Sequence, residues 1–177
     1  MTDSHAPVVN DGTDYLGRIL SLLGSQDPLT VMARTAESIR EKTETISENN
    51  YRLIEAPGKW SVLNVVQHLA HTEVALGFRY RQVLAEEGGV LPAIDQNRWV
   101  SGLYPDDVTI SDALEDFAAL RGVNLRLLQH VKPDEWTRYG LHSQRGKETL
   151  GQMLRLYAAH DLYHLGQIER IIAVVGA

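Results

Sequence analysis

Apolar side chains recur along most of this chain at the spacing of an α-helix. The pattern holds over residues 27–50, 61–86, 111–131 and 149–175, where apolar residues are interleaved with charged ones. A shorter apolar segment, residues 15–23, indicates a small additional helix. We find no run of alternating β-branched residues between these segments. The sequence therefore predicts an all-α fold.

Short helix-breaking sequences separate the predicted helices. Pro57 and Gly58 precede the second long helix, Gly88 and Gly89 end it, and Pro133 closes the third. Four long helices joined in this way predict a four-helix bundle, either up-down or with crossover connections, with a short extra helix at the N-terminus. The connection between the second and third long helices, residues 90–107, is unusually long, and such loops often carry function.

The length of 177 residues suits one domain with its own core. Residues 1–14 are short and polar, so we expect a flexible N-terminus followed by a single helical-bundle domain at residues 15–177. The start of the sequence lacks the basic segment and the apolar segment of a secretory signal peptide. No run of about 18 apolar residues, as a transmembrane helix needs, occurs in the sequence. We therefore expect a cytoplasmic protein with no membrane partner.

Charge and cysteine content narrow the chemistry. A formal net charge of -6 disfavours a surface that tracks nucleic-acid phosphates, so small molecules and proteins are the expected partners. The chain has no cysteine and can form neither disulfides nor thiolate metal sites. Any bound metal must be held by His, Asp, Glu or water.

Two histidines lie in the middle of the apolar stripe of the last helix. At about 100° per residue, His160, His164 and Gln167 fall within this stripe, whereas Arg155 and Glu169 fall on the opposite side. A buried imidazole without a partner costs about 1–3 kcal/mol. An i, i+4 pair can bring two ring nitrogens to one metal ion. The pair therefore indicates a metal site.

Other interpretations of this pair stay open from the residues alone. Each histidine could hydrogen-bond a neighbouring carbonyl or carboxylate. The intervening residues are Asp161, Leu162 and Tyr163, without the glutamate of the metalloprotease His-Glu-x-x-His helix. This difference counts against a peptidase of that type.

A third ligand must come from elsewhere, because catalytic zinc sites usually have three protein ligands and one open position. His68 lies on the flank of the second helix's apolar stripe, and His71 lies nearly opposite that stripe. His130 and His142 are the other candidates, and His68 is the better one. Glu73 lies within the stripe, where it could accept a bond from a ligating histidine, join two helices, or ligate the metal itself.

Two segments together resemble the DinB/YfiT-like superfamily: residues 59–73 (KWSVLNVVQHLAHTE) and residues 160–168 (HDLYHLGQI). Residues 91–99 (LPAIDQNRW) and 146–151 (GKETLG) fit the same pattern, and the resemblance spans residues 27–172. It implies a four-helix bundle. It also implies that His68 joins His160 and His164 to bind zinc, nickel or a similar ion.

The resemblance also suggests activities. Characterised members are thiol S-transferases and isomerases that use low-molecular-weight thiols, and many others are assigned only as metal-dependent hydrolases. An open metal position lowers the pKa of a bound thiol or water. We therefore favour a metal-dependent enzyme in which a thiol or water attacks a small electrophile, with transfer favoured slightly over hydrolysis.

Two alternatives remain. The protein could be a non-catalytic, metal-stabilised, dimeric module for stress response or binding, and the resemblance implies a homodimer in either case. The site could also be vestigial, with its histidines hydrogen-bonded to Glu73, Asp161 or Gln167. Asp161 is either an acceptor for a ligating imidazole or a solvated residue beside it.

Several further residues are candidates for the pocket. Trp60 is typical of a packing anchor more than of a platform for substrate. Helical arginines such as Arg79 and Arg81 could contact an anionic substrate, although most such side chains are solvated. Three residues of the long loop could line the pocket mouth: Asp95, Gln96 and Trp99.

Overall fold

The computed structural model describes residues 12–44, 46–47, 49–105 and 107–176. These residues form four long helices, α2 (Pro28–Thr43), α3 (Val62–Ala85), α5 (Ile110–Leu128) and α6 (Leu150–Val175). Two shorter helices accompany them, α1 (Gly12–Leu23) and α4 (Gln96–Gly102). The mainly helical fold expected from the sequence is confirmed. Among the described residues, no helix combines the length and apolar character needed to cross a lipid bilayer.

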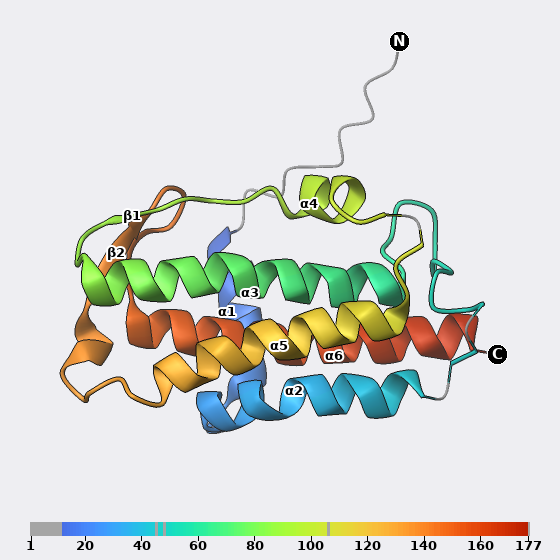
Figure 1. Ribbon diagram of the computed structural model, residues 1–177, viewed down its shortest axis with the longest axis horizontal. Helices are drawn as coiled ribbons and strands as arrows, with labels where there is room; N and C mark the ends of the chain where they lie inside the picture. Colours follow the sequence, from blue (N-terminus) through green and yellow to red (C-terminus); the bar gives the residue numbers. More distant parts are fainter. Residues whose placement is uncertain (1–11, 45, 48, 106, 177) are drawn as a thin grey trace, which may run out of the picture.

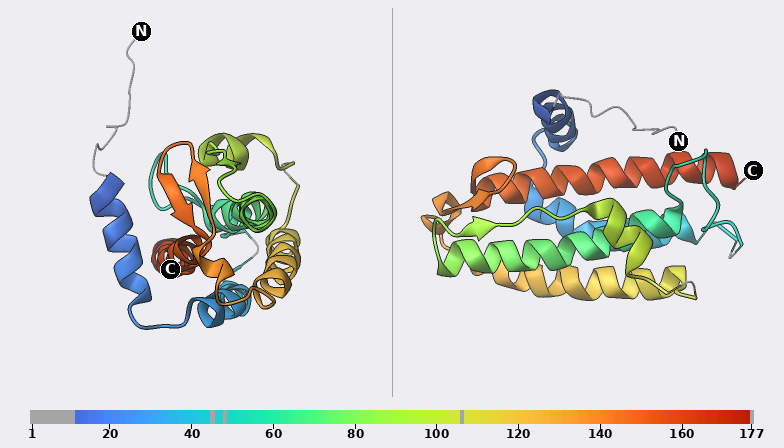
Figure 2. Two further views of the ribbon diagram at one scale, coloured as in Figure 1. Left: turned by 90° about the vertical axis from the view of Figure 1, so that its left-hand side faces the viewer. Right: turned by 90° about the horizontal axis from the view of Figure 1, so that it is seen from above.

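The four long helices form a bundle with a crossover connection (Figure 1). In this view α2 and α6 run from left to right, whereas α3 and α5 run from right to left. α3 packs against α5 and α6, and α2 packs against the same two helices. The segment after α3 must therefore return along the bundle before α5 begins. α1 lies outside the four helices, against α6 (Figure 2).

Capping side chains fix where the two site-bearing helices begin. The Ser61 hydroxyl accepts a hydrogen bond from the Asn64 amide, and the Asn64 side chain accepts one from the Ser61 amide. Thr149 and Gln152 form the same reciprocal box at the start of α6. Because a helix advances in fixed steps of about 1.5 Å per residue, these caps set the height of each histidine within the bundle.

The sequence indicated no strands, and this prediction is wrong. β1 (Val90–Leu91), β2 (Tyr139–His142) and β3 (Gly146–Thr149) form a small sheet in the order β1-β2-β3. β1 and β2 are parallel, and β2 and β3 form an antiparallel hairpin. Strands of two to four residues are too short to show a period.

Some predicted helix boundaries also need correction. α2 ends at Thr43 and does not reach Asn50, and the predicted loop at residues 90–107 contains α4. α1 begins at Gly12, inside the predicted flexible tail, whose residues 1–11 lie outside the described part of the chain. Helix ends are set by capping and tertiary contacts, which periodicity does not report.

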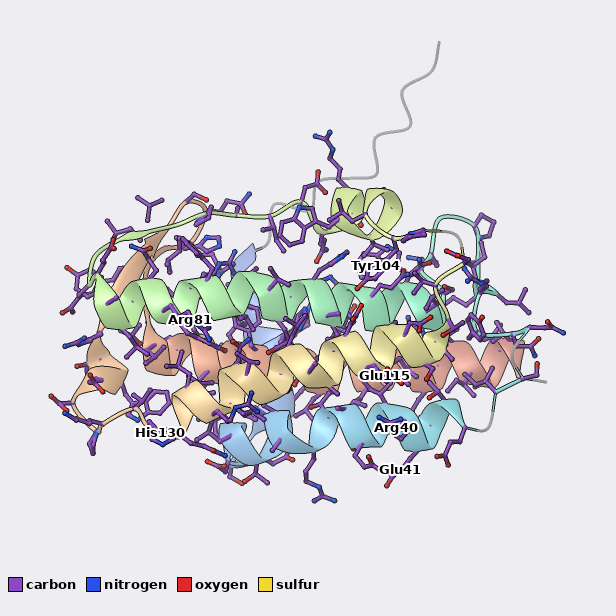
Figure 3. All side chains as sticks on the ribbon, in the orientation of Figure 1. Arg40, Glu41, Arg81, Tyr104, Glu115 and His130 are labelled. Atoms are coloured by element: carbon purple, nitrogen blue, oxygen red, sulfur yellow. The ribbon has the colours of Figure 1, made fainter. Side chains whose placement is uncertain are left out.

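A layer of polar side chains crosses the core between two apolar clusters. One cluster gathers around Leu76, Tyr80 and Met153, and the other around Val66 and Phe117. Between them lie the buried polar residues Glu73, Arg121, Asp161, His68 and His164. Exposed charged residues, by contrast, project from the outer faces of α2 and α5 in Figure 3, among them Arg40, Glu41 and Glu115. Buried polar groups need partners, so this layer marks the candidate functional region.

Candidate metal centre

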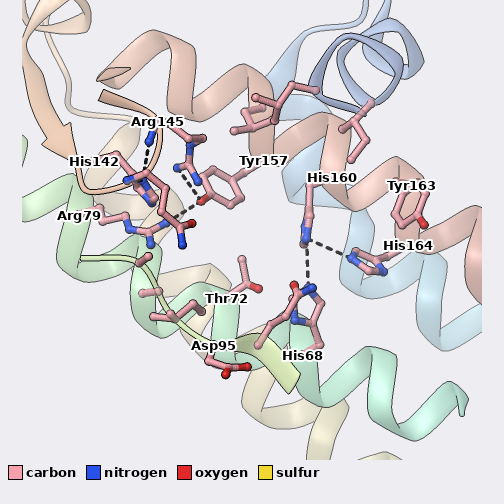
Figure 4. A pocket seen from close by; sticks show the side chains of 18 of the residues that line it. His68, Thr72, Arg79, Asp95, His142, Arg145, Tyr157, His160, Tyr163 and His164 are labelled. Carbon is pink, nitrogen blue, oxygen red and sulfur yellow. Dashed lines mark hydrogen bonds between the residues drawn. The ribbon is translucent and has the colours of Figure 1, made fainter. Parts of the chain in front are cut away.

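Three imidazole rings from two helices meet in this polar layer (Figure 4). His68 comes from α3, and His160 and His164 come from successive turns of α6. The Nε2 atom of His160 lies 3.1 Å from Nε2 of His68 and 3.1 Å from Nε2 of His164. One nitrogen from each ring lies within 4.8 Å of the others. The structure thus brings together the three histidines predicted from the sequence.

This arrangement fits a metal ion better than a hydrogen-bonded cluster. Nitrogens about 2.0–2.1 Å from a tetrahedral zinc ion are about 3.3 Å apart. Two of the three Nε2 separations, at 3.1 Å, are close to this value, and the ligand atoms of all three rings lie within 4.8 Å of one another. In a neutral cluster the single Nε2 proton of His160 could be donated to only one of its two neighbours. A cation instead accepts a lone pair from every ring. The donor set is therefore suited to a divalent transition metal.

Burial keeps all three rings in the neutral form that binds metals. Burial, with smaller contributions from the neighbouring His164 and His71, lowers the pKa of His68 to about 3. Burial lowers the pKa of His164 to about 4, although its bond to Gln167 opposes the shift. Burial, with its two histidine neighbours, holds the pKa of His160 well below the ordinary value. At neutral pH each ring has a lone pair available for a cation.

Two neighbours orient the rings. The Nδ1–H of His164 donates to Oε1 of Gln167 at 2.8 Å, so its Nε2 carries the lone pair that faces the cluster. The Trp60 ring lies 4.9 Å from the His68 ring and is stacked 6.4 Å from the His164 ring. Trp60 thus packs on two of the histidines, as its interpretation as an anchor predicted, and also lines the adjoining pocket.

Comparison with known proteins assigns the chain to a family. The family model described as the DinB superfamily matches residues 32–168. The protein belongs to the DinB superfamily. A relative from Oceanobacillus iheyensis, named "Putative metal-dependent hydrolase", is 29% identical over 132 residues, which are 73% of this chain and 76% of that protein.

YfiT from Bacillus subtilis is similar in both sequence and fold. This relative carries the same "Putative metal-dependent hydrolase" name and is 26% identical over 82% of this chain and 80% of its own. A solved structure of YfiT, described as an unusual four-helix bundle, aligns with a TM-score of 0.76 at 20% identity. The alignment covers 97% of this chain and 94% of that one. The DinB fold expected from the resemblance is therefore confirmed.

The carboxylates proposed to assist the histidines lie elsewhere in this DinB protein. Asp161 accepts hydrogen bonds from Arg121 at 2.6 and 3.0 Å and from Thr35 at 2.9 Å. Glu73 forms an ion pair with Arg121 at 2.9 Å and accepts a bond from Asn124. Asp161 is therefore buried and not solvated, and Glu73 joins α3 to α5.

The other candidate histidines also lie outside the cluster. His71 stacks on Tyr104 and meets the edge of Trp99, and exposed His130 contacts the Arg126 carbonyl oxygen from its Nδ1 atom at 2.7 Å. His142 ends β2 in a different part of the pocket. Among the described residues, the three-histidine group is therefore the one that could hold a metal ion.

The histidines open into a pocket of about 810 Å³. Asp95 and Gln96 line it as the sequence suggested, whereas Trp99 is absent from its lining and packs on His71. Arg79 also lines the pocket, but Arg81 bonds Gly77 and Asn124 instead.

Other lining residues were not predicted, among them Arg145 and Tyr157, and His142 was considered only as a possible metal ligand. His142 and Arg145 belong to the β2–β3 hairpin, which was not predicted, and Tyr157 lies on α6 among apolar residues. An expectation of strands around residues 139–149 could have pointed to His142 and Arg145.

Proposed function

We propose that this protein is a metal-dependent enzyme that activates water or a low-molecular-weight thiol to attack a small electrophile. One observation carries the proposal: three neutral imidazoles bring ring nitrogens within 4.8 Å of one another at the side of a large pocket. The hydrolase names of the relatives support water as the nucleophile. A low-molecular-weight thiol is the alternative nucleophile, and it is suggested by the family resemblance.

Each residue has a role in this proposal. His68, His160 and His164 hold the ion, Gln167 fixes the tautomer and orientation of His164, and Trp60 packs on the rings. A zinc or nickel ion supplies Lewis acidity, which lowers the pKa of a coordinated water or thiol toward neutrality. Three protein ligands leave a fourth position for that molecule.

The open position can be tested with cobalt as a spectroscopic probe. The metal-free protein is loaded with Co²⁺ and titrated with cysteine, while the zinc and nickel forms are assayed for hydrolysis of p-nitrophenyl acetate and for cysteine transfer to monochlorobimane. We expect the visible cobalt spectrum to change with cysteine. We also expect one of the two reactions to fall at least about 100-fold in His160→Ala, as for loss of a catalytic metal.

The matched control is His130→Ala, which removes an exposed histidine outside the pocket. It should retain the metal and the activity of the parent. A cobalt spectrum that does not respond to cysteine, with neither reaction above the metal-free background, would overturn the enzyme proposal. That result would favour the alternative, a non-catalytic binding module.

A homodimer and a cytoplasmic location stay predictions. The metal site depends on neither of them. Size-exclusion chromatography with light scattering tests the homodimer directly. A monomer at all concentrations would remove the dimer from the account without affecting the metal site, because all three proposed ligands come from one chain.

A further inference from the structure

The end of the pocket opposite the histidines collects hydrogen-bond donors and positive charge. Arg79, His142, Arg145 and Tyr157 lie together there, apart from the three imidazoles (Figure 4). They come from α3, the β2–β3 hairpin and α6, so the fold brings together residues that are far apart in the sequence. None of them takes part in the proposed metal site.

Arg79 is a buried cation without an anionic partner in the described part of the chain. Its side chain donates to the Tyr157 hydroxyl at 2.6 Å and to the Pro92 carbonyl at 2.7 Å, and both acceptors are neutral. No ion pair of the described residues includes it. A buried charge that lacks a counter-charge is destabilising, so the pocket is set up to receive an anion.

His142 supplies a buried donor with no acceptor. Its Nδ1 accepts hydrogen bonds from the backbone amides of Gln144 and Arg145 at 3.2 and 3.3 Å. The neutral ring must therefore carry its proton on Nε2, and this buried atom has no partner among the described residues. Burial, with the charges of Arg145 and Arg79, lowers the pKa of His142 to about 4, which keeps the ring neutral.

Tyr157 adds a second free donor. Its hydroxyl oxygen accepts from Arg79 at 2.6 Å and from Arg145 at 3.4 Å, and both arginines can only donate. The hydroxyl proton is therefore directed to neither of them. Arg145 is itself neutralised by Glu148, with which it makes two hydrogen bonds at 3.0 and 2.8 Å. Arg79 thus remains without a direct ion pair among the residues that the structure describes, since Asp95, the carboxylate that lines the pocket, is exposed and accepts a hydrogen bond from a backbone amide of α4.

We propose that Arg79, His142, Arg145 and Tyr157 form a carboxylate-binding subsite that positions substrates for the histidine centre. A buried guanidinium without a direct ion pair, with further donors beside it, matches a monoanion with two acceptor oxygens. The proposal rests on the proposed function for the reaction at the histidine centre. It specifies the substrate class as small electrophiles that carry a carboxylate.

The two ends are connected along two helices. On α3, His68, Thr72 and Arg79 all line the pocket, and the buried Thr72 hydroxyl has no partner among the described residues. On α6, the Tyr157 ring lies 5.8 Å from the His160 ring. A ligand with a few carbon atoms between its carboxylate and its reactive group therefore suits the pocket.

The subsite can be tested by binding, without catalysis. The probes are monomethyl glutarate, a monoanion, and dimethyl glutarate, its neutral analogue. Dissociation constants are measured by NMR from the His142 ring signals, in metal-free and zinc-loaded protein. We expect the monoanion to bind at least about tenfold more tightly in both forms, because a charge-assisted pair with Arg79 does not need the metal.

Variants separate a local effect from a general one. Arg79→Met should abolish the preference for the monoanion, and Arg145→Gln should reduce it. Arg155→Gln, which removes the same charge from an exposed position on α6, should leave it unchanged. If Arg79→Met fails to fold by circular dichroism, Arg145→Gln still decides the result.

Two results would overturn the subsite. One is equal binding, or no binding, of the two esters by the parent protein. The other is a preference that persists in both pocket variants at the level of Arg155→Gln. A charge preference without any ester hydrolysis would support the subsite and count against the proposed function. Hydrolysis of both esters at equal efficiency would support the proposed function and count against the subsite.

Discussion

Neighbouring residues of α6 belong to two very different polar clusters. His160 turns toward His68 and His164, whereas Asp161 turns toward Arg121 and Thr35. Both clusters cross the same layer of the core, and both are largely buried. They differ in whether the chain itself provides the partners.

The arginine cluster is paired within the protein. Arg121 contacts the carboxylates of Asp161 and Glu73 and the Met32 carbonyl oxygen, which ties together all four long helices. Although burial opposes its charge, the two carboxylates raise the pKa of Arg121 above its ordinary value. This cluster has its own counter-charges and is suited to holding the bundle together.

The histidine cluster, by contrast, has no counter-charge among the described residues. Its Nε2 atoms meet without a carboxylate among them, and the one Nε2 proton of His160 cannot be donated to both neighbouring rings. The rings therefore lack the counter-charges that Arg121 has, and their lone pairs suit a bound cation. Burial alone does not separate structural from functional polar groups, whereas the presence or absence of internal counter-charges does.

Breaking the arginine cluster should have the largest effect on folding. Arg121→Met leaves two carboxylates buried without their cation, so we expect the free energy of unfolding to fall by about 3–5 kcal/mol. Urea denaturation of the metal-free protein measures this loss. Arg126→Met, at an exposed position of the same helix, should change stability by no more than about 0.5 kcal/mol. Equal stability of the two variants would contradict a structural role.

Altering the support of the histidine cluster should affect metal affinity instead of folding. Gln167→Leu removes the acceptor for the Nδ1–H of His164, and we expect metal binding to weaken about 10–100-fold. Competition with a chromophoric chelator measures the affinity. Gln167→Glu keeps an acceptor at this position and should restore binding. Unchanged affinity in Gln167→Leu would show that this bond does not position the ligand.

Lowering the pH should reduce the stability of the metal-free protein through the histidine cluster, and this effect should be smaller than that of the two substitutions above. His164 has a folded-state pKa of about 4 and an ordinary value of 6.5. Between these values the unfolded chain takes up a proton that the folded protein excludes, so stability falls as the pH falls. Each such histidine contributes about 1.4 kcal/mol per pH unit within this window.

In metal-free protein, His164→Ala should therefore reduce the slope of stability against pH by about 1.4 kcal/mol per unit between about pH 4.5 and 6. Urea denaturation across this range provides the measurement, with His130→Ala as the exposed control. If the parent and His164→Ala give parallel curves, the imidazole is not kept neutral by the fold.

Much of this picture could be predicted from the sequence, because long helices repeat their pattern. The spacing of His160 and His164 placed both rings on one interior face. The position of His68 on its helix favoured it over His71, and the family resemblance supported that choice. The hairpin at residues 139–149 could not be predicted, because its strands are short and are held by pairing with β1. The place of His142 and Arg145 in the pocket could not be predicted for the same reason.

Asp161 shows a different limit. Its position beside a histidine suggested either support for that ligand or solvation, and the structure shows a buried ion pair with a residue of α5. A helical pattern assigns faces but not partners from other helices. The assignment of the three histidines as metal ligands itself stays a prediction, since geometry shows only that they could hold an ion.

The most direct test of the account is the metal content of the untagged protein and its single-histidine variants. Inductively coupled plasma mass spectrometry would follow reconstitution with zinc or nickel. We predict close to one ion per chain in the parent and in His130→Ala, and loss of the ion in His68→Ala, His160→Ala and His164→Ala. No metal above background in the parent, or full retention in all three variants, would contradict the metal centre.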